Sequence, residues 1–100
     1  MDPILQERFD FYVWIEKKEK RKHIYKEYNR DFINHQIGRN IKKIRNKKGL
    51  FQRELAKIMG LERETISDFE CGRSNIHIHH LLRISAILEC SILDLLKGCL

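Results

Sequence analysis

The chain has 100 residues, of which 42% are hydrophobic, and it carries a formal net charge of +6. This length suits one domain with an appended element, and the hydrophobic share suits a soluble domain with one modest core. The longest apolar run, residues 11–15, is too short for the roughly 20 residues of a membrane-spanning helix. Residues 1–3 do not begin a secretion signal, so we expect a cytoplasmic protein without membrane contact.

The cysteines argue against two kinds of stabilised small domain. Cys71, Cys90 and Cys99 are widely spaced and odd in number. This pattern excludes a disulfide framework and a Cys-x-x-Cys zinc site, and it suits a reducing compartment. We expect Cys90 and Cys99 to be buried as small hydrophobic side chains.

The first third of the chain combines charged and aromatic residues. Residues 16–22 are all charged, with Glu16 and Lys20 at the spacing of a supportive helix pair. We expect residues 1–35 to form a helical extension, with a frayed arm as the alternative. The extension is more aromatic than a tail requires, so we expect it to bury surface against a second subunit, another protein or the domain itself. Its large apolar side chains are Phe9, Tyr12, Val13, Trp14, Ile15, Tyr25, Tyr28 and Phe32.

Glycines divide the rest of the chain into short segments. Apolar residues recur at helical spacing within them, and no stretch alternates with period two for long. We therefore predict an all-α domain of five helices at residues 36–100, with the first three ending at Gly49, Gly60 and Gly72. The positions that mark the helices are, in turn, Ile37, Ile41 and Ile44; Leu55, Ala56 and Met59; Ile66 and Phe69; Ile78, Leu81, Leu82, Ser85, Ala86 and Leu88; and Ile92, Leu95 and Leu96.

The first of these helices is strongly basic. Residues 36–49 hold six Lys or Arg side chains and no acid. Such a block attracts polyanions at long range and releases counterions when it meets phosphates. Alone it is typical of a solvated helix face, and the motif that follows is what favours a nucleic-acid partner.

Residues 52–71, QRELAKIMGLERETISDFEC, predict two short helices that cross at a tight turn. Gly60 stands where the turn needs a positive φ, and Ala56 is small where the helix axes approach. The outer face of the second helix is then free, and it has the shape to enter a DNA major groove roughly 12 Å wide.

At this point the sequence resembles the lambda-repressor-like family, the Cro/XRE type of helix-turn-helix regulators. The resemblance runs from about Ile37 to Leu96. The residues that carry it are Ile37-Gly38, Lys48-Gly49-Leu50, Gln52-x-x-Leu55-Ala56, Gly60-Leu61, Thr65-Ile66-Ser67, Glu70-x-Gly72-Arg73, Leu81-Leu82-x-Ile84 and Ile92-x-x-Leu95.

The resemblance implies a five-helix lambda-repressor-like DNA-binding domain and a role for each matched residue. Gln52 would donate from its side chain and backbone to a phosphate at a helix N-terminus. Apart from the resemblance, we expect Lys43 of the basic helix to act on DNA phosphates. Base edges would be read by Arg63, Glu64 and Asp68, and the sugar-phosphate backbone would be touched by Arg73, Ser74 and Asn75. Arg45 is also counted with the DNA-binding residues. Together with Glu70 it matches a pair that, in family members, bridges the first helix to the end of the recognition helix.

Two features depart from the family pattern. Phe51 replaces the usual Ser or Thr, so the second helix loses a cap typically worth about 1 kcal/mol, and the ring is expected to pack as a hydrophobic plug.

Residues 62–70 hold four acids and one Arg. Acids near phosphates lower affinity, but Glu and Asp also accept a hydrogen bond from cytosine N4, which sharpens specificity. The alternative is that this face has drifted toward binding protein.

The sequence shows neither a typical metal site nor a typical catalytic site. His77-x-His79-His80 lacks a well-spaced ligand set and fits a helix N-terminus, so we expect no metal and no cofactor. No nucleophile–base arrangement or phosphate loop is recognisable, so we expect no enzyme activity.

We therefore expect a nucleoid-associated transcription regulator, a repressor or autoregulator that binds a palindromic operator in duplex DNA as a homodimer. One alternative is the antitoxin of a toxin–antitoxin pair, whose extension binds the toxin. The other is a protein-interaction adaptor that has lost DNA binding.

Overall fold

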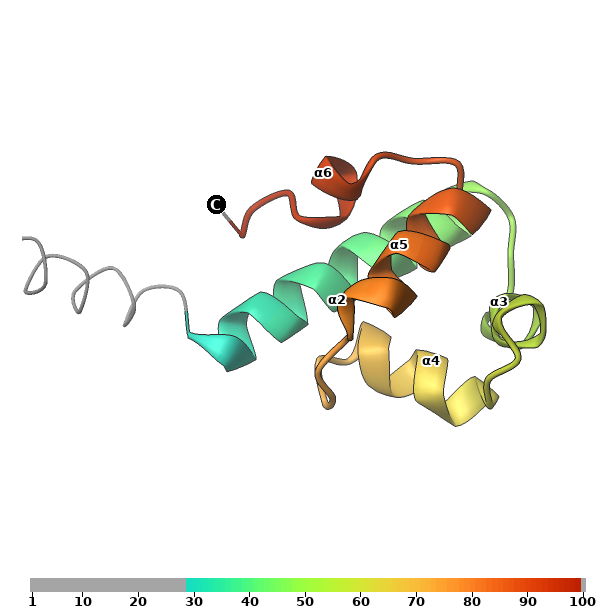
Figure 1. The fold of residues 1–100 in the computed structure, drawn as a ribbon, viewed down its shortest axis with the longest axis horizontal. Helices are drawn as coiled ribbons and strands as arrows, with labels where there is room; N and C mark the ends of the chain where they lie inside the picture. Colours follow the sequence, from blue (N-terminus) through green and yellow to red (C-terminus); the bar gives the residue numbers. More distant parts are fainter. Residues whose placement is uncertain (1–28, 100) are drawn as a thin grey trace, which may run out of the picture.

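The computed structural model describes residues 29–99, which fold as an all-helical domain (Figure 1). Its helices are α2 (Arg30–Lys47), α3 (Gln52–Met59), α4 (Arg63–Glu70), α5 (Ile78–Ile87) and α6 (Ile92–Leu95), with no strand in this part of the chain. The predicted all-α, five-helix fold is confirmed. Most of the predicted extension, including seven of its eight large apolar side chains, lies outside the described residues.

Helix α2 begins earlier than its isoleucine spacing indicated. The Asn29 side chain caps it, because its Oδ1 accepts a hydrogen bond from the Phe32 backbone N–H at 2.8 Å. Residues 30–35 therefore belong to the same helix as Ile37 and Ile41. The helix runs through position 35, where we had placed the end of the extension, and Phe32 is 46% exposed on it.

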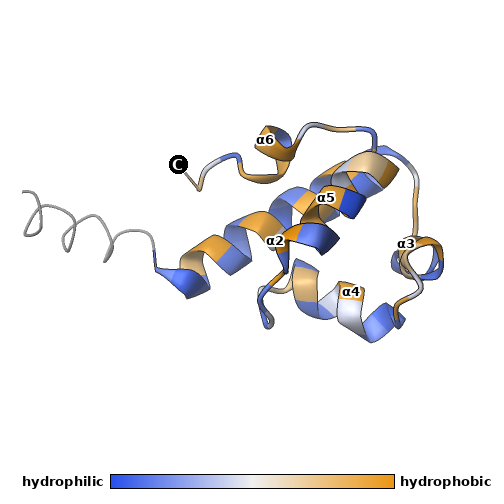
Figure 2. Cartoon of the chain, in the orientation of Figure 1, coloured by the Kyte–Doolittle hydropathy of each residue, from blue (hydrophilic) through white to orange (hydrophobic). Residues whose placement is uncertain are grey.

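One hydrophobic core joins the five helices. Figure 2 shows hydrophobic and hydrophilic residues alternating in bands along α2 and α5, as expected of helices that are buried on one side. The largest side chains that are fully buried come from every helix, so no helix packs as a separate unit. They are Ile41, Leu55, Ile66, Ile84, Leu88 and Leu95.

The turn between α3 and α4 has the predicted geometry. Gly60 ends α3 in the left-handed region, with φ 69° and ψ 30°, where a side chain would be strained. Leu61 then donates its backbone N–H to the Ala56 carbonyl at 2.9 Å, which closes the turn. Figure 1 shows α3 end-on while α4 lies across the view, so the helix axes cross at a steep angle.

Helix α6 is held against α2 by polar contacts. The Asn40 Nδ2 atom donates to the carbonyl oxygens of Leu95 and Lys97, both at 2.8 Å. Ser91 and Asp94 cap α6 reciprocally, each side chain accepting a hydrogen bond from the other's backbone N–H. No described helix is both long enough and apolar enough to cross a membrane.

Candidate nucleic-acid interface

A buried ion pair connects α2 to the end of α4. The Arg45 Nε and Nη2 atoms donate to the two carboxylate oxygens of Glu70 at 2.6 and 2.9 Å. A third hydrogen bond joins Arg45 Nη1 to the Leu50 carbonyl oxygen at 2.6 Å. The two side chains are only 7% and 1% exposed, so the bridge implied by the family resemblance is present. The same burial commits the Arg45 guanidinium to Glu70 and Leu50 within the domain.

The start of α3 joins this polar network. Gln52 donates from Nε2 to Glu70 Oε1 at 3.1 Å, and its Oε1 accepts from Arg63 Nη1 at 3.1 Å. One chain of hydrogen bonds thus links both ends of α4 through the first residue of α3. The side-chain donor that we had assigned to a phosphate is bound within the domain, and it helps to set the angle between α3 and α4.

An open cavity of about 310 Å³ lies at the N-terminus of α3, and Arg63, the first residue of α4, reaches it. Arg45, Phe51, Gln52, Arg53 and Arg63 line it. Helix N-termini carry partial positive charge, and the exposed guanidiniums add full charges, so this cavity favours an anion such as a phosphate. Arg53 was not among the predicted site residues, and its only signal in the sequence is a basic residue in the first turn of a helix.

Phe51 is not the hydrophobic plug that we expected. Its side chain is 61% exposed, and the Arg53 guanidinium lies over the ring, 5.0 Å from its centroid. The other half of a capping box is present, because the Phe51 backbone N–H donates to Glu54 Oε1 at 3.0 Å.

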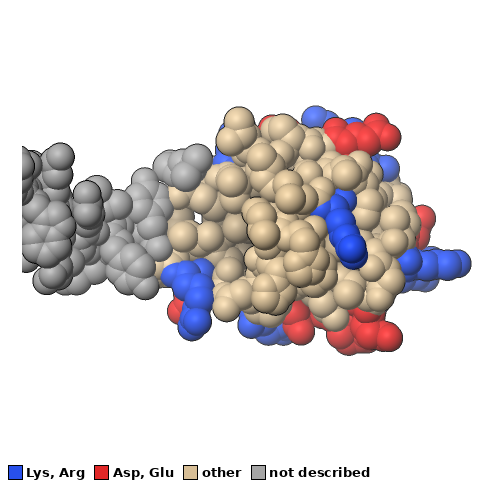
Figure 3. All heavy atoms as spheres, in the orientation of Figure 1, with Lys and Arg blue, Asp and Glu red and all other residues tan. Residues whose placement is uncertain are grey.

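The acidic residues of α4 are mostly paired with arginines. Glu70 is buried against Arg45, and Asp68 accepts from Arg73 Nε at 3.1 Å. Glu64 lies 3.4 Å from Arg63, in a pair that is well exposed. Figure 3 shows both signs of charge interspersed along the edge of the molecule that α4 forms. The outer face of α4 is therefore far less repulsive to DNA than the count of its acids suggested.

The loop after α4 holds three residues that were predicted to contact DNA, and they differ in exposure. Arg73 and Asn75 are exposed, and Asn75 Oδ1 accepts from Asn34 Nδ2 of α2 at 2.7 Å. The hydroxyl oxygen of Ser74 is shielded from solvent. Of the three loop residues predicted to contact DNA, Arg73 and Asn75 therefore have exposed side chains.

Lys43 lies elsewhere on α2. It lines two cavities together with Asn40 and Lys97, beside the C-terminal segment. Gly38 marks the flank of α2 that packs on α4. Lys43 therefore does not extend the surface formed by α3 and α4.

Three histidines cluster at the start of α5. The ring centroids of His79 and His80 are 4.2 Å apart, and those of His77 and His79 are 5.5 Å apart. Within residues 29–99, no three His, Cys, Asp or Glu side chains are arranged to hold a metal ion. Burial lowers the pKa of His80 below its ordinary 6.5, and the neighbouring His79, His77 and Arg83 lower it further.

The lowered pKa of His80 predicts a loss of stability at mildly acidic pH. As the pH falls through about 6.5, the unfolded chain takes up this proton before the folded domain does, so the free energy of unfolding decreases. Urea unfolding at pH 7.5 and 5.5 measures this decrease. His80→Gln should reduce it, and an equal decrease in both proteins would contradict the assignment.

Comparisons with known proteins agree with this geometry. A model of the helix-turn-helix family matches residues 41–95, which include all of α3 to α6. The fold is similar to that of the restriction-modification controller protein C.AhdI from Aeromonas hydrophila, with 28% identity and a TM-score of 0.58 over 61% of this chain and 92% of that one. It is also similar to the hypothetical transcription factor NHTF from Neisseria, with 29% identity and a TM-score of 0.62 over 68% and 78% of the two chains.

A third similar structure is the clp gene regulator ClgR from C. glutamicum, with 25% identity and a TM-score of 0.63 over 67% of this chain and 87% of that one. No curated protein matches the sequence significantly.

Proposed function

Because the chain belongs to the Cro/XRE-type helix-turn-helix family of DNA-binding transcription regulators, we propose that it represses transcription by binding a palindromic operator as a homodimer. The observation that carries the proposal is that the N-terminus of α3, with Arg53, and the first residue of α4, Arg63, line one open cavity. A phosphate in this cavity would place the outer face of α4 against the major groove.

The proposal assigns different tasks to different side chains. Arg53 and the backbone N–H of Gln52 would hold phosphates, which are the same in every sequence. Arg63, Glu64 and Asp68 would face base edges from α4, and Arg73 and Asn75 would follow the sugar-phosphate backbone. Ser74 contributes only if the loop changes conformation on binding. Lys43 would contribute only to the long-range electrostatic attraction of DNA.

Selection of bound DNA from a random duplex pool tests this function. We expect enrichment of a sequence with dyad symmetry and half-sites about one helical turn apart. Enrichment of an asymmetric site would contradict the dimer, and the absence of any enrichment would contradict sequence-specific binding.

Arg53→Ala and Arg63→Ala distinguish contacts with phosphates from contacts that recognise the base sequence. Arg53→Ala should weaken specific and non-specific binding alike and reduce the salt slope by about 1, because a phosphate contact is lost. Arg63→Ala should cost about 1–3 kcal/mol of discrimination at one base pair. Fluorescence anisotropy on operator and scrambled duplexes measures both. Lys57→Ala, an exposed change on α3 outside the cavity, is the matched control, and a base-specific effect of Arg53→Ala would contradict the assignment.

Asp68→Asn tests whether the acids of α4 face DNA. The change removes a charge and keeps the size, so non-specific binding should tighten and the ratio of specific to non-specific affinity should fall. Both affinities come from the same anisotropy titrations. If both are unchanged, this face of α4 does not lie in the groove.

Exposed apolar side chains support a dimer. Ile78 and Leu82 lie one turn apart on α5 and are 65% and 52% exposed. They provide apolar surface for a second copy. We expect the aromatic residues of the extension, which except for Phe32 lie outside the described residues, to add to it. Sedimentation of the full chain, of Leu82→Lys and of a chain that begins at Asn29 tests this. We expect both variants to dissociate at lower concentration than the parent, and identical self-association of all three would contradict it.

A further inference from the structure

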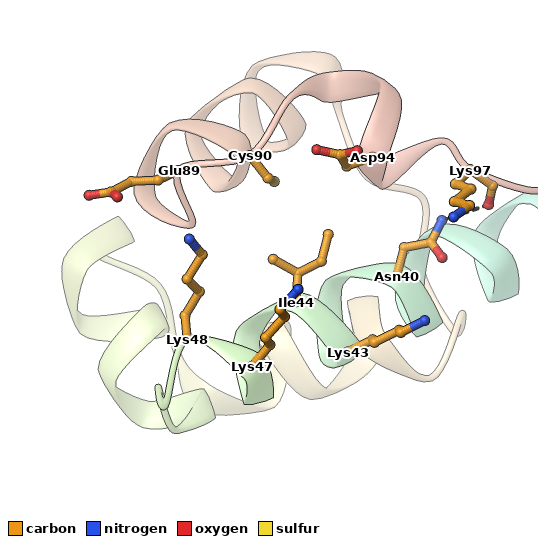
Figure 4. Close-up of a pocket in the computed structure, with 9 residues that line it drawn as sticks. All are labelled: Asn40, Lys43, Ile44, Lys47, Lys48, Glu89, Cys90, Asp94 and Lys97. Carbon is orange, nitrogen blue, oxygen red and sulfur yellow. Dashed lines mark hydrogen bonds between the residues drawn. The ribbon is translucent and has the colours of Figure 1, made fainter.

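A second cavity lies between α2 and the segment that contains α6, and the DNA-binding proposal does not use it. Its volume is about 370 Å³. Ile44 and Cys90 form its apolar part, and Figure 4 shows Ile44 and Lys48 pointing from the α2 side toward Cys90. Cavities of this size are at the lower end of those that hold small molecules.

The rim of this cavity carries excess positive charge. Lys43, Lys47 and Lys48 come from the end of α2, and Lys97 comes from the chain after α6. All the ion pairs within residues 29–99 are made by arginines, so none of these lysines is neutralised by a described carboxylate. Four ammonium groups that have no carboxylate partner among residues 29–99 surround this cavity, and such a group of charges attracts anions.

The two acids that line the cavity offset part of this charge and leave four lysines against two carboxylates. The Asp94 carboxylate accepts the Ser91 backbone N–H at 3.0 Å, which holds it at the start of α6 and leaves its charge in place. Figure 4 shows the Glu89 carboxylate directed away from the lysines at the rim. The lining as a whole therefore carries two more positive than negative charges, with the excess at the lysine rim.

The walls of the cavity are held in place without a ligand. Asn40, itself a lining residue, ties α2 to the carbonyl oxygens of Leu95 and Lys97. These contacts fix the spacing between α2 and the C-terminal segment on one side. A ligand would therefore lose little binding energy to ordering the site.

We propose that this cavity binds a small organic anion, a carboxylate or phosphate attached to a compact apolar body. The lysines receive the charged group, and Ile44 and Cys90 receive the apolar part. The site lies on the flank of α2 away from α4, so the ligand and DNA can be bound at the same time. Arg45 on the same helix holds Glu70, which gives a bound ligand a physical connection to the end of α4.

Titration with 8-anilinonaphthalene-1-sulfonate, a fluorescent anion with an aromatic body, tests the proposal without DNA. Lys47→Gln and Lys97→Gln should each weaken binding by roughly tenfold, since this corresponds to about 1.4 kcal/mol, close to a hydrogen bond to a charged group. Lys57→Gln on α3 is the matched control and should have no effect. The uncharged analogue N-phenyl-1-naphthylamine should bind all variants equally and weakly.

Amide chemical shifts locate the probe. We expect the largest changes at the Asn40 side chain, Ile44 and Cys90, with the rest of the spectrum preserved in each variant. Binding that is insensitive to the lysines, or shifts elsewhere, would overturn the proposal. A Glu-rich decapeptide that binds the cavity more tightly than the sulfonate would also overturn it, in favour of an acidic protein partner. Since no DNA is present, failure here leaves the proposed regulator function untouched.

Discussion

Replacing Glu70 with alanine is expected to lower the free energy of unfolding by about 3–5 kcal/mol, because Arg45 is left buried without a counter-charge. Small domains are stable by only about 5–15 kcal/mol, so a large part of the variant population should unfold on mild heating. Urea unfolding followed by circular dichroism measures the change. Asp68→Ala is the matched control, since it breaks an ion pair whose side chains are 63% and 47% exposed. It should cost about 0–1 kcal/mol.

Glu70→Ala removes both a counter-charge and packed volume, and a paired substitution distinguishes these two losses. Arg45→Met combined with Glu70→Leu removes both charges and keeps apolar volume, so it should recover much of the stability that Glu70→Ala loses. DNA binding need not recover with it, because Gln52 also loses its partner on α4. If Glu70→Ala costs no more than Asp68→Ala, the buried bridge does not stabilise the domain.

Gly38→Ala should destabilise the domain, although alanine favours a helix over glycine by about 1 kcal/mol. A Cβ atom at this position would lie 2.6 Å from the Glu70 carbonyl oxygen and closer still to that of Phe69. Both neighbours are backbone atoms, so α4 as a whole would have to move away from α2. We expect a loss of about 1–3 kcal/mol, measured by thermal unfolding.

The control for Gly38→Ala is Asn46→Ala on the exposed side of the same helix. It should leave stability unchanged or raise it by a few tenths of a kcal/mol, as helix propensity alone predicts. Because the displaced α4 is the helix proposed to read bases, Gly38→Ala should also weaken operator binding. A Gly38→Ala protein as stable as the parent would contradict the close packing of α2 on α4.

Some features of this domain follow from local sequence. Gly60 predicted a left-handed turn because glycine alone adopts that conformation without strain, and the structure has it. Apolar spacing predicted the five helices, because a helix buries one face whichever partner covers it. The pairing of Arg45 with Glu70 needed the family resemblance, since 25 positions separate the two residues.

Other features depend on partners that the local pattern does not reveal. Gln52 was predicted to point at a phosphate, but Glu70 and Arg63 meet its side chain only after α3 and α4 have crossed. The charges of residues 36–49 were treated as one block, whereas a helix distributes them around its circumference and turns Lys43 toward the C-terminal segment. Gly38 lies inside a helical pattern, where the sequence gives no reason for a glycine. The structure explains it, because the backbone of α4 passes too close to leave room for a side chain.

The most direct test of the proposed docking is a map of amide chemical shifts on adding a duplex of about 20 base pairs at low salt. If DNA docks on α3 and α4, the largest changes fall at the first residues of α3 and α4 and at Arg73, including Gln52, Arg53 and Arg63. Residues of α6 and the chain up to Lys97 should change little. Changes that gather instead along Lys43, Lys47 and Lys97 would show that DNA binds the opposite flank of α2 and would contradict the proposed docking.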